Sequence, residues 1–194
     1  MPKLGMEPIR KAALVRATIL EVGRAGSLDV TVSQIARRAG MSAALAHHYF
    51  GSKEQIFLAA MRHILSLYGA EVRGALVAAE GGPRARLRAI VRASFAPGSF
   101  RAEVIGAWLN FYVLAQTLPE AKRLLSVYQR RLQSNLVHDL RPLIGLRAEA
   151  AARGLGALID GVYIREVLRR GAPDGAAAAA LVMEHLEREL DGQG

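Results

Sequence analysis

The sequence predicts an all-α protein with an N-terminal three-helix head that contains a helix-turn-helix, followed by a larger C-terminal helical module. Alanine is abundant, β-branched runs are short, and no alternating strand pattern bounded by hairpin turns occurs. The segment 31–53, TVSQIARRAGMSAALAHHYFGSK, has the pattern of two short helices joined at Gly40. Apolar stripes at helical spacing recur through the remaining residues, which predicts further helices there.

The distribution of charge indicates what kind of partner the protein binds. The net charge is +9, and residues 1–62 carry nine Lys or Arg against four Asp or Glu. An excess of this size favours a polyanionic partner, either a nucleic acid or a membrane surface. Alternatively, the positive net charge reflects an arginine-rich surface that is solvated and binds no polyanion.

The first helix is expected to begin at Pro8 and to end near Gly26. Its predicted core positions are Ala13, Ala17, Leu20 and Ala25. Lys3, Arg10 and Lys11 are candidates for contact with DNA phosphates or a minor groove, as in other basic arms. Simple solvation explains each of these three residues equally well.

Two capping residues and one glycine define the predicted helix-turn-helix. The Thr31 hydroxyl is a good N-cap for the first short helix, and Ser42 caps the second, which extends from 43 to 49. Gly40 can adopt the left-handed conformation that ends a helix. Ala36 is small enough to let the helices cross closely, and Ala46 is expected to face the shared core. The second helix is then free to enter a major groove.

The DNA-contacting residues that this arrangement predicts lie on the outer side of the second helix and around it. They are Thr31, Arg37, Ser42, Ala43, Ala44, Leu45, His47 and His48. Among them, Ala43 and Ala44 suit contact with thymine methyl groups. Pairs of short helices joined by a glycine also occur in helical domains that bind no DNA, so this alternative stays open.

The later helices are expected at 52–79, 83–96, 101–118, 119–142, 148–169 and 174–190. Glu80–Pro83 is the clearest break, and Pro142 is expected to end or kink its helix. We expect a DNA-binding head at residues 1–51 and a ligand-binding and dimerisation domain at 52–194, joined by the helix that begins after Ser52. The small residues and apolar stripes of the last two helices favour a dimer interface, and a monomer is the alternative.

Aromatic residues and one carboxylate in the second module predict a small-molecule site. The candidate ligand-binding residues are Trp108, Phe111, Tyr112, Tyr128, Asp160 and Tyr163. Aromatic rings attract quaternary ammonium groups, and Asp160 lies in the apolar segment LGALIDGVYI, where an unpaired carboxylate is costly. Alternatively, the aromatic residues are ordinary core and Asp160 pairs with an Arg or a helix N-terminus.

Several functional classes lack support. Without cysteine, disulfides and thiolate metal sites are excluded. We find no nucleophile elbow, phosphate loop, HExxH motif or paired catalytic acids, so we expect neither an enzyme nor a bound cofactor. His47 and His48 have no third metal ligand at suitable spacing. The N-terminus lacks the apolar stretch of a signal peptide, and we expect a cytoplasmic protein without membrane spans that joins the nucleoid when bound to DNA.

The segment HHYFGSKEQIFLAAM resembles the TetR family of bacterial transcriptional repressors. The resemblance implies that Tyr49 and Lys53 hold the DNA backbone and that the protein is a homodimer. The segments MPKLGMEPIRKAAL, AWLNFY and AARGLGALIDGVYIR are similar to the branch of this family that represses choline uptake and choline-to-glycine-betaine genes. This finer similarity implies that choline relieves repression in osmoprotection. The alternative is a TetR-type repressor that responds to an unrelated small molecule, such as a drug-efflux or catabolic regulator.

Overall fold

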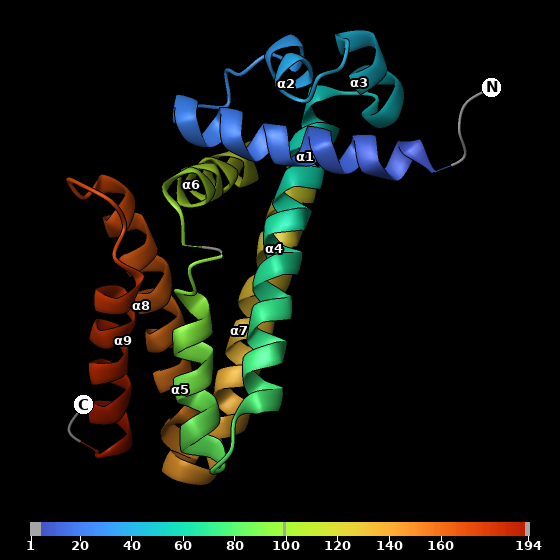
Figure 1. Cartoon of the computed structure of the whole chain (residues 1–194). Helices are drawn as coiled ribbons and strands as arrows, with labels where there is room; N and C mark the ends of the chain where they lie inside the picture. Colours follow the sequence, from blue (N-terminus) through green and yellow to red (C-terminus); the bar gives the residue numbers. More distant parts are fainter. Residues whose placement is uncertain (1–4, 99, 193–194) are drawn as a thin grey trace. The chain divides into compact units, whose positions relative to one another are not determined.

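The computed structural model describes residues 5–98 and 100–192, and every regular element in them is helical (Figure 1). The elements are α1 (Met6–Ala25), α2 (Val32–Arg38), α3 (Ala43–Phe50), α4 (Lys53–Ala78), α5 (Pro83–Ser94), α6 (Ala102–Thr117), α7 (Pro119–Ile144), the short 3-10 helix η1 (Gly145–Arg147), α8 (Ala148–Leu168) and α9 (Gly175–Leu190). The predicted all-α class is confirmed. Within the described part of the chain, no helix combines the length and apolarity that crossing a bilayer requires.

The contacts group the helices into two compact units, and each is described by itself. Unit 1 contains α1, α2 and α3, α4 as far as residue 64, α6 from residue 103, and α7 as far as residue 124. Unit 2 contains the remaining parts of α4 and α7 together with α5, α8 and α9. The predicted boundary after residue 51 separates two functions, and it stays a prediction. The boundaries between the two contact-based units lie elsewhere, within α4 and α7.

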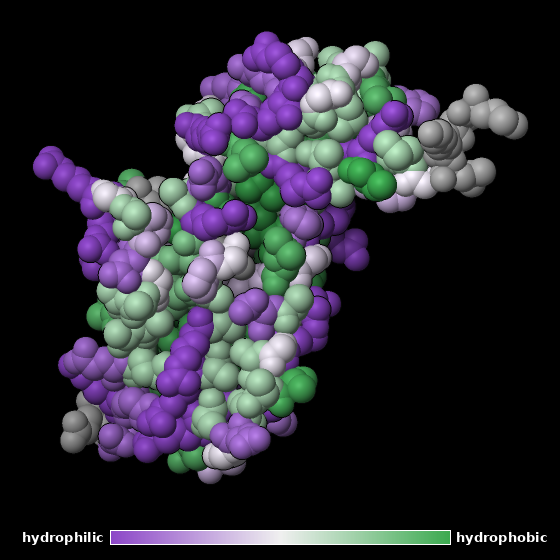
Figure 2. Space-filling model, in the orientation of Figure 1, coloured by the Kyte–Doolittle hydropathy of each residue, from purple (hydrophilic) through white to green (hydrophobic). Residues whose placement is uncertain are grey.

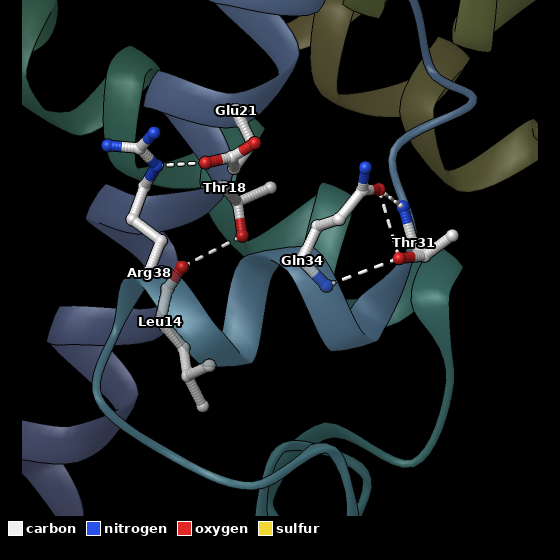
Figure 3. A network of polar contacts seen from close by, with 6 residues as sticks. All are labelled: Leu14, Thr18, Glu21, Thr31, Gln34 and Arg38. Carbon is white, nitrogen blue, oxygen red and sulfur yellow. Dashed lines mark hydrogen bonds and ion pairs between the residues drawn. The ribbon is translucent and has the colours of Figure 1, made fainter.

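In unit 1, the buried face of α1 differs from the predicted one. Of the predicted positions only Ala17 is buried, whereas Ala13 and Leu20 are partly exposed and Ala25 is exposed. The stripe Leu14, Thr18 and Val22, each 0% exposed, faces the core instead. The Thr18 hydroxyl donates to the Leu14 carbonyl at 2.8 Å (Figure 3), which satisfies the one polar group in this stripe.

Helix α2 is fixed at both ends by polar contacts (Figure 3). At its start the Thr31 hydroxyl accepts from the Gln34 N–H at 3.2 Å, and the Gln34 side-chain oxygen accepts from the Thr31 N–H at 2.7 Å. This reciprocal capping box confirms Thr31 as the N-cap. At its end Arg38 forms an ion pair with Glu21 of α1. The start of the helix-turn-helix is therefore set locally, and its orientation is set against α1.

Helices α1 and α6 approach each other at two glycines within unit 1. A Cβ on Gly23 would lie 2.1 Å from the backbone oxygen of Glu103, and one on Gly106 would lie 3.0 Å from the carbonyl oxygen of Gly23. Real Cβ atoms do not come this close to backbone, so the crossing requires glycine at position 23. Through this crossing α6 packs directly against α1 of the helix-turn-helix head.

We therefore expect Gly23→Ala to lower the free energy of unfolding by about 1–3 kcal/mol, because the new methyl group must push two backbones apart. This loss outweighs the roughly 1 kcal/mol that alanine gains over glycine in a helix. Urea unfolding followed by circular dichroism measures the difference. The matched control is Gly74→Ala in α4, where an added Cβ meets no atom within 4 Å and stability should rise. A Gly23→Ala protein as stable as the wild type would contradict the close crossing.

In unit 2, a leucine-rich interior joins four helices. Its fully buried members include Leu87 and Ile90 of α5, Leu136 and Leu140 of α7, Leu155 of α8 and Leu186 of α9. Arg86 of α5 donates to Asp139 of α7 at 2.8 Å, and the Asp139 carboxylate is almost completely buried. Pro142 does not end α7, since the helix continues to Ile144, and the alternative of a kink at Pro142 stays a prediction. Proline removes one backbone hydrogen bond of the helix, which ends two residues later.

Candidate functional site

The turn between α2 and α3 has the geometry that the sequence predicts. Gly40 has a φ of 69°, in the left-handed region that favours glycine. The Met41 N–H donates to the Ala36 carbonyl at 2.9 Å, and the Ser42 hydroxyl accepts from the Leu45 N–H at 3.2 Å. Ala36 and Ala46 are completely buried, which lets α2 and α3 pack closely. The turn at Gly40, the Ser42 cap and the close packing of α2 on α3 therefore define the geometry of the helix-turn-helix.

The outer side of α3 is open to a partner. Ser42, Ala44, His47 and His48 are exposed, Ala43, Leu45 and Tyr49 are partly exposed, and Ala46 is the one buried residue between 42 and 50. A ring nitrogen of His47, Nδ1, lies 3.2 Å from the Gly51 carbonyl oxygen. This contact orients the imidazole at the end of α3. The predicted base-contacting residues thus share one accessible face.

Exposed or partly exposed cationic residues occur on α1, on α2 and at the start of α4. Thr31 and Arg37 are exposed, and Lys53 Nζ lies 5.3 Å from the centre of the Phe57 ring at the start of α4. On α1, Arg10 donates to the Tyr49 hydroxyl at 3.4 Å and Lys11 Nζ lies 5.9 Å from the Tyr49 ring centre. Tyr49 is therefore held among basic side chains, as a phosphate-contacting residue would be. Lys3 lies outside the described residues.

The carboxylate of Asp160 lies among tyrosines in unit 2. The Tyr128 hydroxyl donates to Asp160 Oδ1 at 3.0 Å, and the Tyr68 and Tyr128 rings meet edge to face with centres 5.4 Å apart. Burial, and to a smaller extent the nearby Asp160, raises the pKa of Tyr68 to about 12. Burial likewise raises the pKa of Tyr163 well above its usual range, with smaller contributions from Tyr68 and Asp160. These phenols therefore stay neutral at physiological pH.

A second aromatic group adjoins this carboxylate through Tyr163. The Tyr163 ring lies 5.9 Å from Phe95 and 5.0 Å from Phe100, centre to centre. Phe95 and Phe100 are themselves 5.3 Å apart and nearly perpendicular. The Tyr68 hydroxyl is 3.2 Å from the Ser94 hydroxyl. The sequence carries no signal for Phe100 or Ser94, because no local pattern links them to positions 68 and 163.

The six predicted ligand-binding residues divide between the two units. Tyr128, Asp160 and Tyr163 come together in unit 2, as described above. Trp108 and Tyr112 of α6 belong to unit 1, where their rings meet edge to face with centres 5.4 Å apart. Phe111, also in unit 1, is completely buried among core side chains. A role of these six residues in binding stays a prediction.

Two hollows open on the surface of unit 2. One, of about 430 Å³, lies between α4 and α7. The other, of about 870 Å³, lies between α4, α5 and the start of α9, and Phe95 and Phe100 form part of its wall. Alanines line much of the larger hollow, and Figure 2 shows weakly hydrophobic side chains mixed with hydrophilic ones over α5 and α9. In residues 5–98 and 100–192, no group of three His, Asp or Glu side chains is placed to hold a metal ion.

Comparison with known proteins identifies both parts of the chain. The family described as "Bacterial regulatory proteins, tetR family" matches residues 14–60, and "BetI-type transcriptional repressor, C-terminal" matches residues 83–191. The chain is 50% identical over 194 residues to the HTH-type transcriptional regulator BetI of Brucella suis biovar 1, covering 100% of this chain and 98% of the relative. It is 49% identical over 198 residues to BetI of Agrobacterium fabrum, covering 100% and 96%.

Solved structures share the fold. A transcriptional regulator from Pseudomonas aeruginosa PAO1 superimposes with a TM-score of 0.83 at 27% identity, covering 98% of this chain and 94% of that one. A regulator from Saccharomonospora viridis, solved in complex with choline, gives a TM-score of 0.79 at 22% identity, covering 91% and 95%.

These matches extend over the helix-turn-helix and over the helices that hold Asp160 and its tyrosines. They agree with the exposed α3 and the basic residues around it, and they make the protein a transcriptional regulator and not an enzyme. The chain belongs to the TetR family of bacterial regulatory proteins, as a transcriptional repressor of the BetI type.

Proposed function

We propose that this repressor binds an inverted-repeat operator as a homodimer and releases it when choline enters unit 2. The observation that carries the effector assignment is the Asp160 carboxylate, held by Tyr128 at 3.0 Å and close to Tyr68 and Tyr163. The choline-bound state of a structural neighbour and the 50% identity to BetI support the same ligand.

On DNA, α3 lies in the major groove with Ser42, Ala43, Ala44, Leu45 and His47 toward the base edges. Thr31, Arg37, His48, Tyr49 and Lys53 contact phosphates, which fixes register without reading sequence. The exposure of the α3 face and the basic residues around Tyr49 support this assignment. Bound to DNA in this way, the protein acts in the cytoplasm at the nucleoid.

Lys53→Ala is expected to weaken binding to all DNA sequences alike and to reduce the slope of log affinity against log salt by about 0.9, because one phosphate contact is lost. Fluorescence anisotropy with upstream DNA and with a scrambled fragment, over a salt series, measures both effects. His47→Ala serves as the comparison, since His47 is exposed and assigned to base edges, so its effect should depend on DNA sequence. An effect of Lys53→Ala confined to one base position would contradict its role as a phosphate contact.

Choline suits the Asp160 site on physical grounds. Its quaternary ammonium group carries a fixed positive charge and no N–H donors, so it is bound by aromatic rings and by a nearby carboxylate. Each ring contributes about 0.5–2 kcal/mol, and the neutral phenols keep electron-rich faces available. In the free protein the Tyr128 hydroxyl satisfies part of the carboxylate.

The experiment is operator binding in a choline titration. Millimolar choline should weaken binding of the wild type, and Asp160→Asn should raise the choline concentration needed by at least about tenfold, equivalent to about 1.4 kcal/mol. Asp191→Asn, an exposed acid of the same unit, is the matched control and should respond like the wild type. If choline is without effect while another small molecule releases the operator, the effector assignment is wrong and the repressor assignment stands.

We further propose that α8 and α9 form the dimer interface. Gly154, Ala157, Gly161, Ile164 and Leu168 follow one another at the alternating three- and four-residue spacing of a helix-packing seam. Ile164 is 41% and Leu168 77% exposed, and a Cβ added to Gly154 or Gly161 would meet no atom within 4 Å. Leu181 of α9 is also exposed. An unpaired apolar seam with room for a closely packed helix supports pairing with a second copy.

A further inference from the structure

The hollow between α4 and α7, here called the α4–α7 pocket, shares Tyr68 and Tyr128 with the Asp160 site but contains two arginines and no carboxylate. Its volume is about 430 Å³, within the range of small-molecule pockets. It is lined by Leu65, Tyr68, Gly69, Val72 and Arg73 of α4 and by Val127, Tyr128, Arg131, Leu132 and Asn135 of α7. All of these residues belong to unit 2, and none of them is acidic.

Two guanidinium groups give this pocket a positive character. Arg73 and Arg131 are both exposed, and neither has an acidic partner among the described residues. A Cβ added to Gly69 would lie 3.2 Å from Arg73 Nη1, so the guanidinium folds back over Gly69 at the pocket. Asn135 adds an amide beside these charges. Two arginines and an amide are a set of donors suited to an oxyanion.

The remaining lining is apolar. Val72 and Leu132 are each only 4% exposed and form the inner part of the pocket. Tyr68 and Tyr128 contribute their rings, because their hydroxyls are engaged with Ser94 and Asp160, which do not line the pocket. A ligand that fills this space therefore needs an apolar body, and its charged end must face the arginines.

We infer that the α4–α7 pocket binds a small organic carboxylate with an aliphatic body, as a second effector site beside the one for choline. The carboxylate pairs with Arg73 and Arg131, and the aliphatic chain covers Val72, Leu132 and the tyrosine rings. A quaternary ammonium ion is disfavoured here, since it would meet two guanidinium charges and no carboxylate. The inference goes beyond the choline response and does not depend on it.

Isothermal titration of the full-length protein with octanoate tests this site. Octanoate should bind the wild type, and the double variant Arg73→Gln, Arg131→Gln should bind it at least about tenfold more weakly, because two charge-assisted contacts are lost. Arg130→Gln is the matched control: it removes the same charge from the neighbouring position of α7, which is exposed and does not line the pocket. It should bind octanoate like the wild type.

Two further arms make the result decisive. The neutral 1-octanol should bind the wild type and the double variant alike, since it lacks the anion. Asp160→Asn should keep octanoate binding while losing the choline response, which separates the two sites. The absence of octanoate binding by the wild type would overturn the inference, and so would an equal loss in Arg130→Gln. Thermal melts by circular dichroism verify that the arginine variants and Asp160→Asn remain folded.

Discussion

Ile164→Arg is expected to convert the repressor into monomers and to weaken operator binding by about a hundredfold or more. Ile164 belongs to the exposed α8 seam, and a guanidinium there would have to be desolvated against its two-fold copy. Two linked heads bind two half-sites far more tightly than either head alone, with a gain of about 10²–10⁴. Loss of the dimer removes this gain without altering α3.

Analytical ultracentrifugation and fluorescence anisotropy measure the two effects on the same samples. Val77→Arg is the matched control, because Val77 of α4 is 89% exposed and the change adds the same charge to an apolar surface residue. It should stay dimeric and bind the operator at least as well as the wild type. A dimeric Ile164→Arg protein would show that α8 does not form the interface.

Arg86→Ala is expected to lower the free energy of unfolding by about 3 kcal/mol. The substitution leaves Asp139 as a buried carboxylate without its counter-ion. The loss of stability is large because the cost of removing this charge from water is then no longer offset by an ion pair. The side chain of Asp139 is 3% exposed and that of Arg86 33%, so water can replace the lost cation only in part. Asp139 Oδ2 is buried and has no hydrogen-bond partner in the described part of the chain, which leaves Arg86 as its main stabilisation.

Urea unfolding of single and double variants measures this contribution. Arg84→Ala is the control, since Arg84 forms exposed ion pairs with Glu187 and Asp191 and should cost less than about 1 kcal/mol. Arg86→Leu combined with Asp139→Leu should recover most of the stability that Arg86→Ala loses, because no buried charge remains. Equal losses for Arg84→Ala and Arg86→Ala would contradict the assigned cost of the buried carboxylate.

The helix-turn-helix was predictable because its signals are local. The Thr31 and Ser42 hydroxyls cap the helices that directly follow them, and Gly40 supplies the left-handed turn. The buried face of α1 was not predictable in this way. Apolar residues lie on more than one side of α1, and its packing in unit 1 selects Leu14, Thr18 and Val22.

The candidate effector site was predictable only in part. Asp160 stood out in the sequence because a carboxylate is costly in an apolar helix, and its aromatic neighbours were expected on other helices. Its hydrogen-bond partner, Tyr128, lies thirty-two residues away in the chain. No local pattern favoured this partner over an arginine or a helix N-terminus. The arginines of the α4–α7 pocket likewise carry no distinguishing sequence pattern, because only the packing of α4 and α7 encloses the hollow.

The sequence by itself determined the helical class, the caps of α2 and α3 and the turn between them, because caps and glycines act on backbone groups within a few residues. Tertiary structure alone decided which carboxylate meets which partner: Asp139 pairs with Arg86, whereas Asp160 accepts a hydrogen bond from the Tyr128 hydroxyl. The physical reason is that a buried charge is stabilised by groups within a few ångströms, and helices packed side by side bring together residues that are far apart in the chain.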